Sequence, residues 1–366
     1  MSITQNPAFR VFIFLAALVI VLAGIKTAQQ LVVPFLLSIF IAIICQPVIL
    51  FIERYRVPKM LAITIVILFV ITLGFSLAGL VGNSLNSFSQ DLPEYKTKLQ
   101  NEIAWLSQQL ATFNIHLNKE QLIEHFDPGA AMSLATNMLS GLGNTLTNFF
   151  LILLTTVFML LEAGTIQKKL HLAWDDPYMH IDRIDRFLTS VNHYIAIKTV
   201  VSLGTGVLAG LLCWSMGLDY FVLWGVLGFL FNYIPNIGSI IAAIPAVLLA
   251  FIQLSPVGAL FVGLGYMAIN AIMGNMVEPK YMGKGLGLST LVVFLSLVFW
   301  GWLLGTVGML LSVPLTMVVK IACEGSESTR WFAVILSNQS EVNNKVEQLP
   351  EEVQLEIEKE VLTEKS

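Results

Sequence analysis

Glu278 is the side chain with the most unusual surroundings. It follows 58 consecutive uncharged residues, 220–277, and precedes Pro279. An ionisable group at the edge of such an apolar stretch is a candidate for function, because burying a charge is costly unless the charge is paired. A buried carboxyl group of this kind could exchange a proton while a solute moves. The alternative is an ordinary interfacial ion pair with Lys280 or Lys284.

A turn signature interrupts the same apolar stretch. The segment NYIPNIG contains Pro235, Asn236 and Gly238. Proline removes a backbone donor, whereas asparagine and glycine tolerate left-handed backbone angles. One interpretation is a re-entrant tip, with freed backbone groups and the side chains of Asn232, Tyr233 and Asn236 facing a substrate. The other is a structural helix break that neighbouring helices satisfy.

Four more polar side chains are candidates. Asn270 and Asn275 share a segment with Glu278. Asn270 lies inside an apolar run, so it must find a hydrogen-bond partner on another helix or on a substrate. His193 and Lys198 lie where an amphipathic segment meets an apolar one. They could form a gate or proton relay, or they could be an interfacial histidine and a lysine reaching towards water.

Signatures of known catalytic chemistry are absent from the sequence. There is no Walker A, H-E-x-x-H, G-x-S-x-G or dinucleotide-binding pattern. The three cysteines, Cys45, Cys213 and Cys323, lie far apart in apolar surroundings and form no C-x-x-C pair. We therefore expect no enzyme, no cofactor and no metal site. The net charge of −4 gives no sign of a nucleic-acid partner.

The composition places these residues in a membrane. Hydrophobic residues make up 56% of the 366 residues and charged residues only 12%, against roughly 25% charged in soluble domains. So little charge cannot cover a water-facing surface, which makes membrane lipid a partner. We expect an all-α polytopic protein with about seven or eight transmembrane helices.

Changes in polarity divide the chain. Residues 1–82 are expected to hold the N-terminal transmembrane helices, 83–140 a polar helical insertion outside the cytoplasm, and 141–162 a further transmembrane helix. Residues 163–198 read as a cytoplasmic amphipathic helical region, 199–320 as a transmembrane core and 321–366 as a cytoplasmic acidic tail. Pro235, Pro245 and Pro256 predict broken or re-entrant helices in the core. Such breaks indicate a transport site, since non-helical backbone in a membrane must be sheltered by protein or line a wet cavity.

The positive charges predict an orientation. With eight crossings and a re-entrant segment at Phe221–Phe231, 14 of the 20 Lys and Arg residues fall on the cytoplasmic side, including every Arg. Both termini are then cytoplasmic. If Phe221–Phe231 crossed the membrane instead, Lys280 and Lys284 would lie on the cytoplasmic side.

The C-terminal half contains three long motifs: NYIPNIGSIIAAIP at 232–245, NMVEPKYMGKGLGLS at 275–289 and LSLVFWGWLLGTVGMLLSVPLT at 295–316. Two shorter segments, VFMLLE at 157–162 and HYIAIKT at 193–199, accompany them. Together they resemble the autoinducer-2 exporter family of bacterial inner-membrane proteins. The likeness covers nearly the whole chain and is strongest to the member that exports the quorum-sensing signal autoinducer-2. It implies a small-molecule substrate and a homo-oligomer, for instance a pentamer.

Three functions are compatible with these observations. The first is a secondary transporter or facilitator that exports autoinducer-2, or a similar small polar metabolite, and so affects quorum sensing. The second is a sodium/proton antiporter, although Asp219 and Glu278 are the only acids between Lys198 and Glu324. The third is a non-transporting membrane scaffold, which would need no broken helices.

Overall fold

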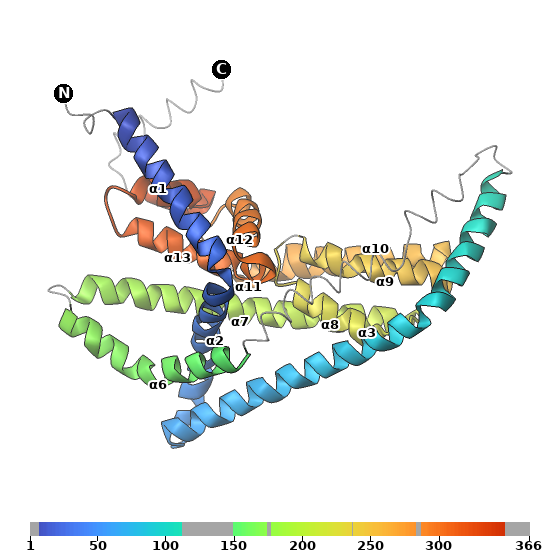
Figure 1. Cartoon of the computed structure of the whole chain (residues 1–366), viewed down its shortest axis with the longest axis horizontal. Helices are drawn as coiled ribbons and strands as arrows, with labels where there is room; N and C mark the ends of the chain where they lie inside the picture. The colour runs from blue at the N-terminus through green and yellow to red at the C-terminus, as the bar shows by residue number, and fades with distance from the viewer. Residues whose placement is uncertain (1–6, 112–148, 174–176, 236, 283–286, 348–366) are drawn as a thin grey trace.

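The computed structural model describes residues 7–111, 149–173, 177–235, 237–282 and 287–347 (Figure 1). Most of these residues are helical. The helices are α1 (Pro7–Thr27), α2 (Gln29–Glu53), α3 (Lys59–Ala111), α6 (Phe149–Ala173), α7 (Pro177–Ser215), α8 (Phe221–Phe231), α9 (Gly238–Leu254), α10 (Pro256–Ile272), the π-helix η2 (Met273–Val277), α11 (Glu278–Met282), α12 (Thr290–Leu310), α13 (Ser312–Glu324), α14 (Arg330–Leu336) and α15 (Gln339–Glu347). The described residues contain no strand, only an isolated antiparallel bridge between Leu288 and Ser337.

The helices have the lengths and compositions of membrane spans. Within the described residues, five are long and apolar enough to cross a bilayer, and four shorter ones are also apolar. Large apolar side chains point outwards: Leu31 and Met267 are each 70% exposed. Surfaces of this kind need lipid or another protein against them. The prediction of an all-α polytopic membrane protein is confirmed, and the exact number of crossings stays a prediction.

The predicted breaks in the C-terminal half are confirmed, with one correction. A turn that includes residues 232–235 and 237 separates α8 from α9, and α9 ends at Leu254, after which Ser255, with a φ of 103°, turns the chain before Pro256. α12 contains a kink at Gly305, where φ is 69°. Pro245 was expected to break the chain as well, but it lies inside α9, whose helix continues past it. A proline removes a single backbone donor, and the buried packing around Pro245 tolerates that loss.

α7 is the central helix of the structure. Near its beginning Val191, Tyr194 and Ile195 pack into one apolar cluster with residues of α2, α12 and α13. Near its end Ala209 and Cys213 pack into a second cluster, formed mainly with α3, α8, α9 and α10. Figure 1 shows α8, α9 and α10 beside the later part of α7, and α13 near its first part.

The helices α3 and α7 each continue across a region boundary that the sequence suggested. α3 continues past residues 82 and 83, and α7 continues past 198 and 199, so neither change in polarity coincides with a break in the backbone. The first part of the polar region after residue 83 packs on the bundle, since Phe88, Tyr95 and Leu99 belong to the apolar cluster around α8 and α9. Residues 112–140 of the expected insertion, Asn236 and the tail after residue 347 lie outside the described residues.

Paired polar contacts hold α3 to the α7–α8 turn. The Tyr95 hydroxyl donates to Asp219 at 3.0 Å, and the Tyr220 hydroxyl donates to Asp91. Each side thus contributes one tyrosine and one aspartate. The turn between α7 and α8 places Tyr220 at a positive φ of 58°. Burial, followed by the hydrogen bond to Asp91, raises the pKa of Tyr220 to about 12.

Candidate functional site

Two predicted residues, 80 positions apart, form a buried ion pair. The Lys198 ammonium group on α7 donates to both carboxylate oxygens of Glu278, at 2.7 and 2.9 Å. The side chains are only 5% and 18% exposed, respectively. Two charges removed from water need such close pairing, because an unpaired buried charge costs several kcal/mol (roughly 3–5).

The lysine belongs to a polar stripe on the apolar segment of α7. Tyr194, Lys198 and Ser202 follow one another at four-residue intervals, which places them on one face of α7. All three are buried. The stripe lies within Leu188–Ser215, a segment long and apolar enough to span a membrane. The site therefore lies inside the helical bundle. One of the two interpretations of the sequence placed Lys198 at the edge instead, reaching towards water.

The carboxylate is placed by an irregular helix. α10 continues through the π-helix Met273–Val277 into α11, of which Glu278 is the first residue. A π-turn inserts an extra residue into the helical repeat and so changes the direction of the side chains after it. The expected interfacial partner Lys280 is exposed, and Glu278 binds Lys198 instead.

The turn between α8 and α9 reaches the same stripe. The Asn232 amide donates to the Ser202 hydroxyl at 2.9 Å, and the Tyr233 hydroxyl donates to that of Thr199 at 2.8 Å. Tyr194 lies close enough to interact electrostatically with both Tyr233 and Glu278. The turn and the ion pair therefore form one continuous polar site along α7.

Backbone contacts fix the shape of this turn. Ile234 donates to Phe231, and Gly238 donates to Ile234, at 2.8 and 3.2 Å. Pro235 is buried. At Gly238 a Cβ atom would lie 1.7 Å from the Phe231 carbonyl oxygen, so the position admits only glycine. These backbone hydrogen bonds lie within the turn, whereas the structural interpretation of this motif expected neighbouring helices to supply them; the side chains of Asn232 and Tyr233 contact α7.

Three predicted residues lie away from this cluster. His193 and Asn275 are exposed, and His193 lies on a different face of α7 from Lys198 because five residues turn a helix by about 500°. Asn270 lines a separate groove of about 740 Å³ between α9 and α10, together with Ser239 and Tyr266. The site brings together Lys198, Glu278, Asn232 and Tyr233 but not these three.

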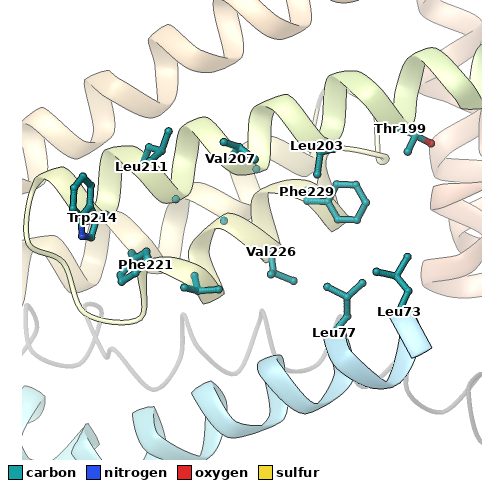
Figure 2. A pocket seen from close by; sticks show the side chains of 14 residues that line it. Leu73, Leu77, Thr199, Leu203, Val207, Leu211, Trp214, Phe221, Val226 and Phe229 are labelled. Atoms are coloured by element: carbon teal, nitrogen blue, oxygen red, sulfur yellow. The ribbon is translucent and has the colours of Figure 1, made fainter. Parts of the chain in front are cut away.

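An apolar groove ends beside the polar stripe. It encloses about 760 Å³ between α3, α7 and α8, and Thr199 is its one hydroxyl-bearing lining residue (Figure 2). Figure 2 shows Thr199 at one end of the row of α7 side chains and Trp214 at the other. The floor is made by close helix contact: a Cβ on Gly206 would lie 2.6 Å from the Gly225 carbonyl oxygen. Thr199, which accepts the Tyr233 hydroxyl, thus lies at one end of this apolar groove.

Sequence reasoning missed Tyr194, Thr199 and Ser202. Their signal was the four-residue spacing from Tyr194 through Lys198 to Ser202, which identifies one helix face once the segment is recognised as a single helix. The division at residue 198 concealed that spacing. Among the described residues, no group of three or more His, Cys, Asp or Glu side chains could hold a metal ion.

The arrangement places a neutralised ion pair next to uncharged polar groups. Lys198 and Glu278 neutralise each other within the bundle. The neighbouring hydroxyl and amide groups of Tyr194, Tyr233 and Asn232 offer hydrogen bonds to a small polar molecule.

Comparison with known proteins agrees with a transport role. The sequence pattern described as "AI-2E family transporter" matches residues 15–327. The chain is 43% identical to the "AI-2 transport protein TqsA" of Escherichia coli K12 over 336 residues, covering 92% of this chain and 97% of that protein. It is 45% identical to a "Putative transport protein" of Haemophilus influenzae, covering 90% and 96%. It is 37% identical to the "Putative transport protein YhhT" of E. coli K12, covering 91% and 95%.

Proposed function

Because this chain belongs to the AI-2E transporter family, we propose that it exports autoinducer-2, or a similar small polar metabolite, across a bacterial inner membrane. The name of the E. coli relative TqsA, which refers to AI-2 transport, supports this substrate. The observation that carries the proposal is the buried Lys198–Glu278 pair inside a helix long enough to span a membrane. Ionisable groups within membrane-spanning helices are costly to bury and are characteristic of transport pathways.

The proposed pathway follows the polar stripe of α7. A hydrophilic solute exchanges its hydration for hydrogen bonds from Asn232, Tyr233 and the Lys198–Glu278 pair. The turn residues Pro235 and Gly238 hold the two polar side chains in place. Asn270, Asn275 and His193, which lie away from this cluster, are assigned to the approach to this pathway and not to its centre.

Energy coupling is assigned to Glu278. Protonation of its carboxylate frees the Lys198 ammonium group to bind solute, and deprotonation restores the ion pair and displaces the solute. The proposed arrangement is a homo-oligomer, for instance a pentamer, with both termini in the cytoplasm, an extracytoplasmic insertion at 83–140 and a cytoplasmic tail after residue 321.

A sodium/proton antiporter has less support. The two acids between Lys198 and Glu324 both have partners: Glu278 binds Lys198, and Asp219 accepts the hydroxyl of Tyr95. A sodium site needs several oxygen ligands that are not already occupied by cations or donors. The matched family and relatives carry transport names and no antiporter name.

The decisive experiment is counterflow of labelled autoinducer-2 into liposomes that contain only this protein. We expect uptake into vesicles preloaded with unlabelled autoinducer-2 and none into protein-free vesicles. A sodium-triggered pH change in the same vesicles, without counterflow, would indicate the antiporter instead. Absence of any solute movement with correctly folded protein would contradict transport and favour the scaffold.

A further inference from the structure

A second buried lysine lies close to the other end of the segment that begins at Glu278. Lys320, on α13, is 6% exposed, and the preceding part of that helix, from Ser312 to Met317, is buried. Its ammonium group donates to the Gly287 carbonyl oxygen at 2.8 Å and to the Glu341 carboxylate, while Glu324 lies 4.0 Å away. Glu341 belongs to α15, in the polar C-terminal region expected to be a solvated tail.

Backbone contacts join the same two segments. Asn338 donates its N–H to the Gly287 carbonyl oxygen at 3.0 Å, and Ser289 donates to Leu336 at 3.1 Å. Between them, Leu288 and Ser337 form the antiparallel bridge. The Asn338 side chain then accepts from the Glu341 N–H at 2.9 Å, which starts α15 in the direction that brings Glu341 to Lys320.

Gly287 is shaped for this contact. Its φ is 60°, a conformation that favours glycine. A Cβ atom there would lie 2.5 Å from a Glu341 carboxylate oxygen and 2.6 Å from the Lys320 nitrogen. The ion pair thus occupies the space beside the glycine. Any larger residue would displace Lys320 or Glu341.

The contact is connected to the polar stripe. Leu288 is buried in the same apolar cluster as Val191, Tyr194 and Ile195 of α7. Gly287 lies nine residues after Glu278. Glu278 and Gly287 are therefore each bound by a buried lysine: Lys198 binds the Glu278 carboxylate, and Lys320 binds the Gly287 carbonyl oxygen.

We propose that residues 337–347 are a clasp that positions Glu278 through the Lys320–Glu341 pair, so that solute transport depends on the docked C-terminal segment. Glu341 and Lys320 are positioning residues in this proposal, which rests on the proposed function. When the clasp opens, Lys320 loses the Glu341 carboxylate, and Ser337 no longer holds Leu288 in the apolar cluster that it shares with Tyr194 of α7. Lys198, which follows Tyr194 by one helical turn, then no longer meets Glu278 in a fixed geometry, and transport slows.

The test combines a charge-neutral variant with a covalent substitute for the clasp. Facing residues of an antiparallel bridge have Cα atoms about 4.5–5.5 Å apart, within the range that a disulfide spans. Leu288→Cys and Ser337→Cys are introduced into the full chain after Cys45, Cys213 and Cys323 are replaced by alanine. Glu341→Gln then removes the charge. Glu327→Gln, on the exposed turn between α13 and α14, is the matched control.

The proposal expects Glu341→Gln to slow disulfide formation and to lower autoinducer-2 flux at least fivefold, while Glu327→Gln changes neither. Oxidation to the disulfide should restore flux in Glu341→Gln, and reduction should remove it again. A merely stabilising contact would not give this reversible rescue. Flux in Glu341→Gln equal to that in the control, or a cross-linked variant as slow as the reduced one, would overturn the clasp.

Two further readouts separate this proposal from the proposed substrate. Cross-linking rate and protease cleavage after residue 347 are measured without any solute. If the parent protein moves no autoinducer-2, the proposed function fails, and unchanged cross-linking in Glu341→Gln would still overturn the clasp by itself. Should Glu341→Gln fail to insert, Glu341→Asp keeps the charge on a shorter side chain and is expected to cross-link at an intermediate rate; a parent-like rate would contradict the proposal.

Discussion

Lys198 is buried more deeply than the carboxylate to which it binds: 5% of its side chain is exposed, against 18% for Glu278. The pair is therefore asymmetric. Loss of the carboxylate strands a cation inside the bundle, whereas loss of the lysine leaves an anion with some access to solvent. This difference in exposure predicts that removal of the Glu278 carboxylate and removal of the Lys198 ammonium group lower the stability of the protein by different amounts.

Glu278→Ala should destabilise the protein more than Lys198→Met. Breaking a buried pair typically costs about 3–5 kcal/mol, and the partly exposed position of Glu278 should keep the cost of Lys198→Met below about 2 kcal/mol by the same reasoning. The double variant should be more stable than Glu278→Ala alone, because it leaves no unpaired charge. Thermal unfolding in detergent measures all three, and strictly additive losses would contradict a coupled pair.

Glu278→Gln should remove the pH dependence of flux while leaving insertion intact. Glutamine preserves the shape and a hydrogen bond to Lys198 but cannot exchange a proton. Glu162→Gln is the matched control, since Glu162 pairs with Lys169 in an exposed position on α6. The measurement is the initial rate of autoinducer-2 uptake at pH values from about 6 to about 8, a range that includes physiological pH. A parent-like pH profile in Glu278→Gln would remove Glu278 from coupling.

Much of this site could be predicted from the sequence, and the reasons differ from residue to residue. Glu278 stood out because charge is rare in an apolar stretch, and Pro235 with Gly238 identified the turn by backbone chemistry alone. Its partner could not be identified, because Lys280 and Lys284 are nearer along the chain than Lys198. Only the packing of α11 against α7 brings residues 80 positions apart together.

The sequence was less informative about His193 and about the C-terminal region. His193 attracted attention because imidazole titrates near neutral pH, but helical rotation separates it from Lys198. The region after residue 337 looked solvated because it is polar. Its first part binds Lys320 through Glu341, a contact that composition does not reveal since the partner lies inside an apolar helix.

Gly238→Ala should disrupt the α8–α9 turn, whereas Gly79→Ala should not harm α3. The added methyl group at residue 238 would meet the Phe231 carbonyl oxygen at 1.7 Å, and backbone cannot move aside as a side chain can. At Gly79 nothing lies within 4 Å, and alanine should gain about 0.5–1 kcal/mol from its greater helix propensity. The melting temperatures of the two variants should shift in opposite directions; equal shifts would show that the turn adapts.

The crossed pairs Tyr95–Asp219 and Tyr220–Asp91 should act together in holding α3 against the α7–α8 turn. Each hydroxyl removed costs about 1 kcal/mol. Tyr95→Phe/Tyr220→Phe should therefore widen the distance distribution between spin labels on α3 and α9, and the single variants should widen it less. Tyr55→Phe is the control, because Tyr55 is 69% exposed. Identical distributions in the double variant and the control would exclude a holding role.

Alkaline pH should loosen the same contact through Tyr220. Its pKa, raised by burial and by the hydrogen bond to Asp91, is about 12, against an ordinary value of 10.0. A raised pKa means that the folded protein binds the phenolic proton more tightly than the unfolded chain does. The resulting stability is complete below pH 10 and is lost as the pH rises from 10 to 12. Asp91, Tyr95 and Asp219 interact with the Tyr220 hydroxyl, so the comparison with Tyr220→Phe isolates its contribution. The parent should lose spin-label order over this interval by more than Tyr220→Phe does, and superimposable titrations would show that the Tyr220 proton does not stabilise the turn.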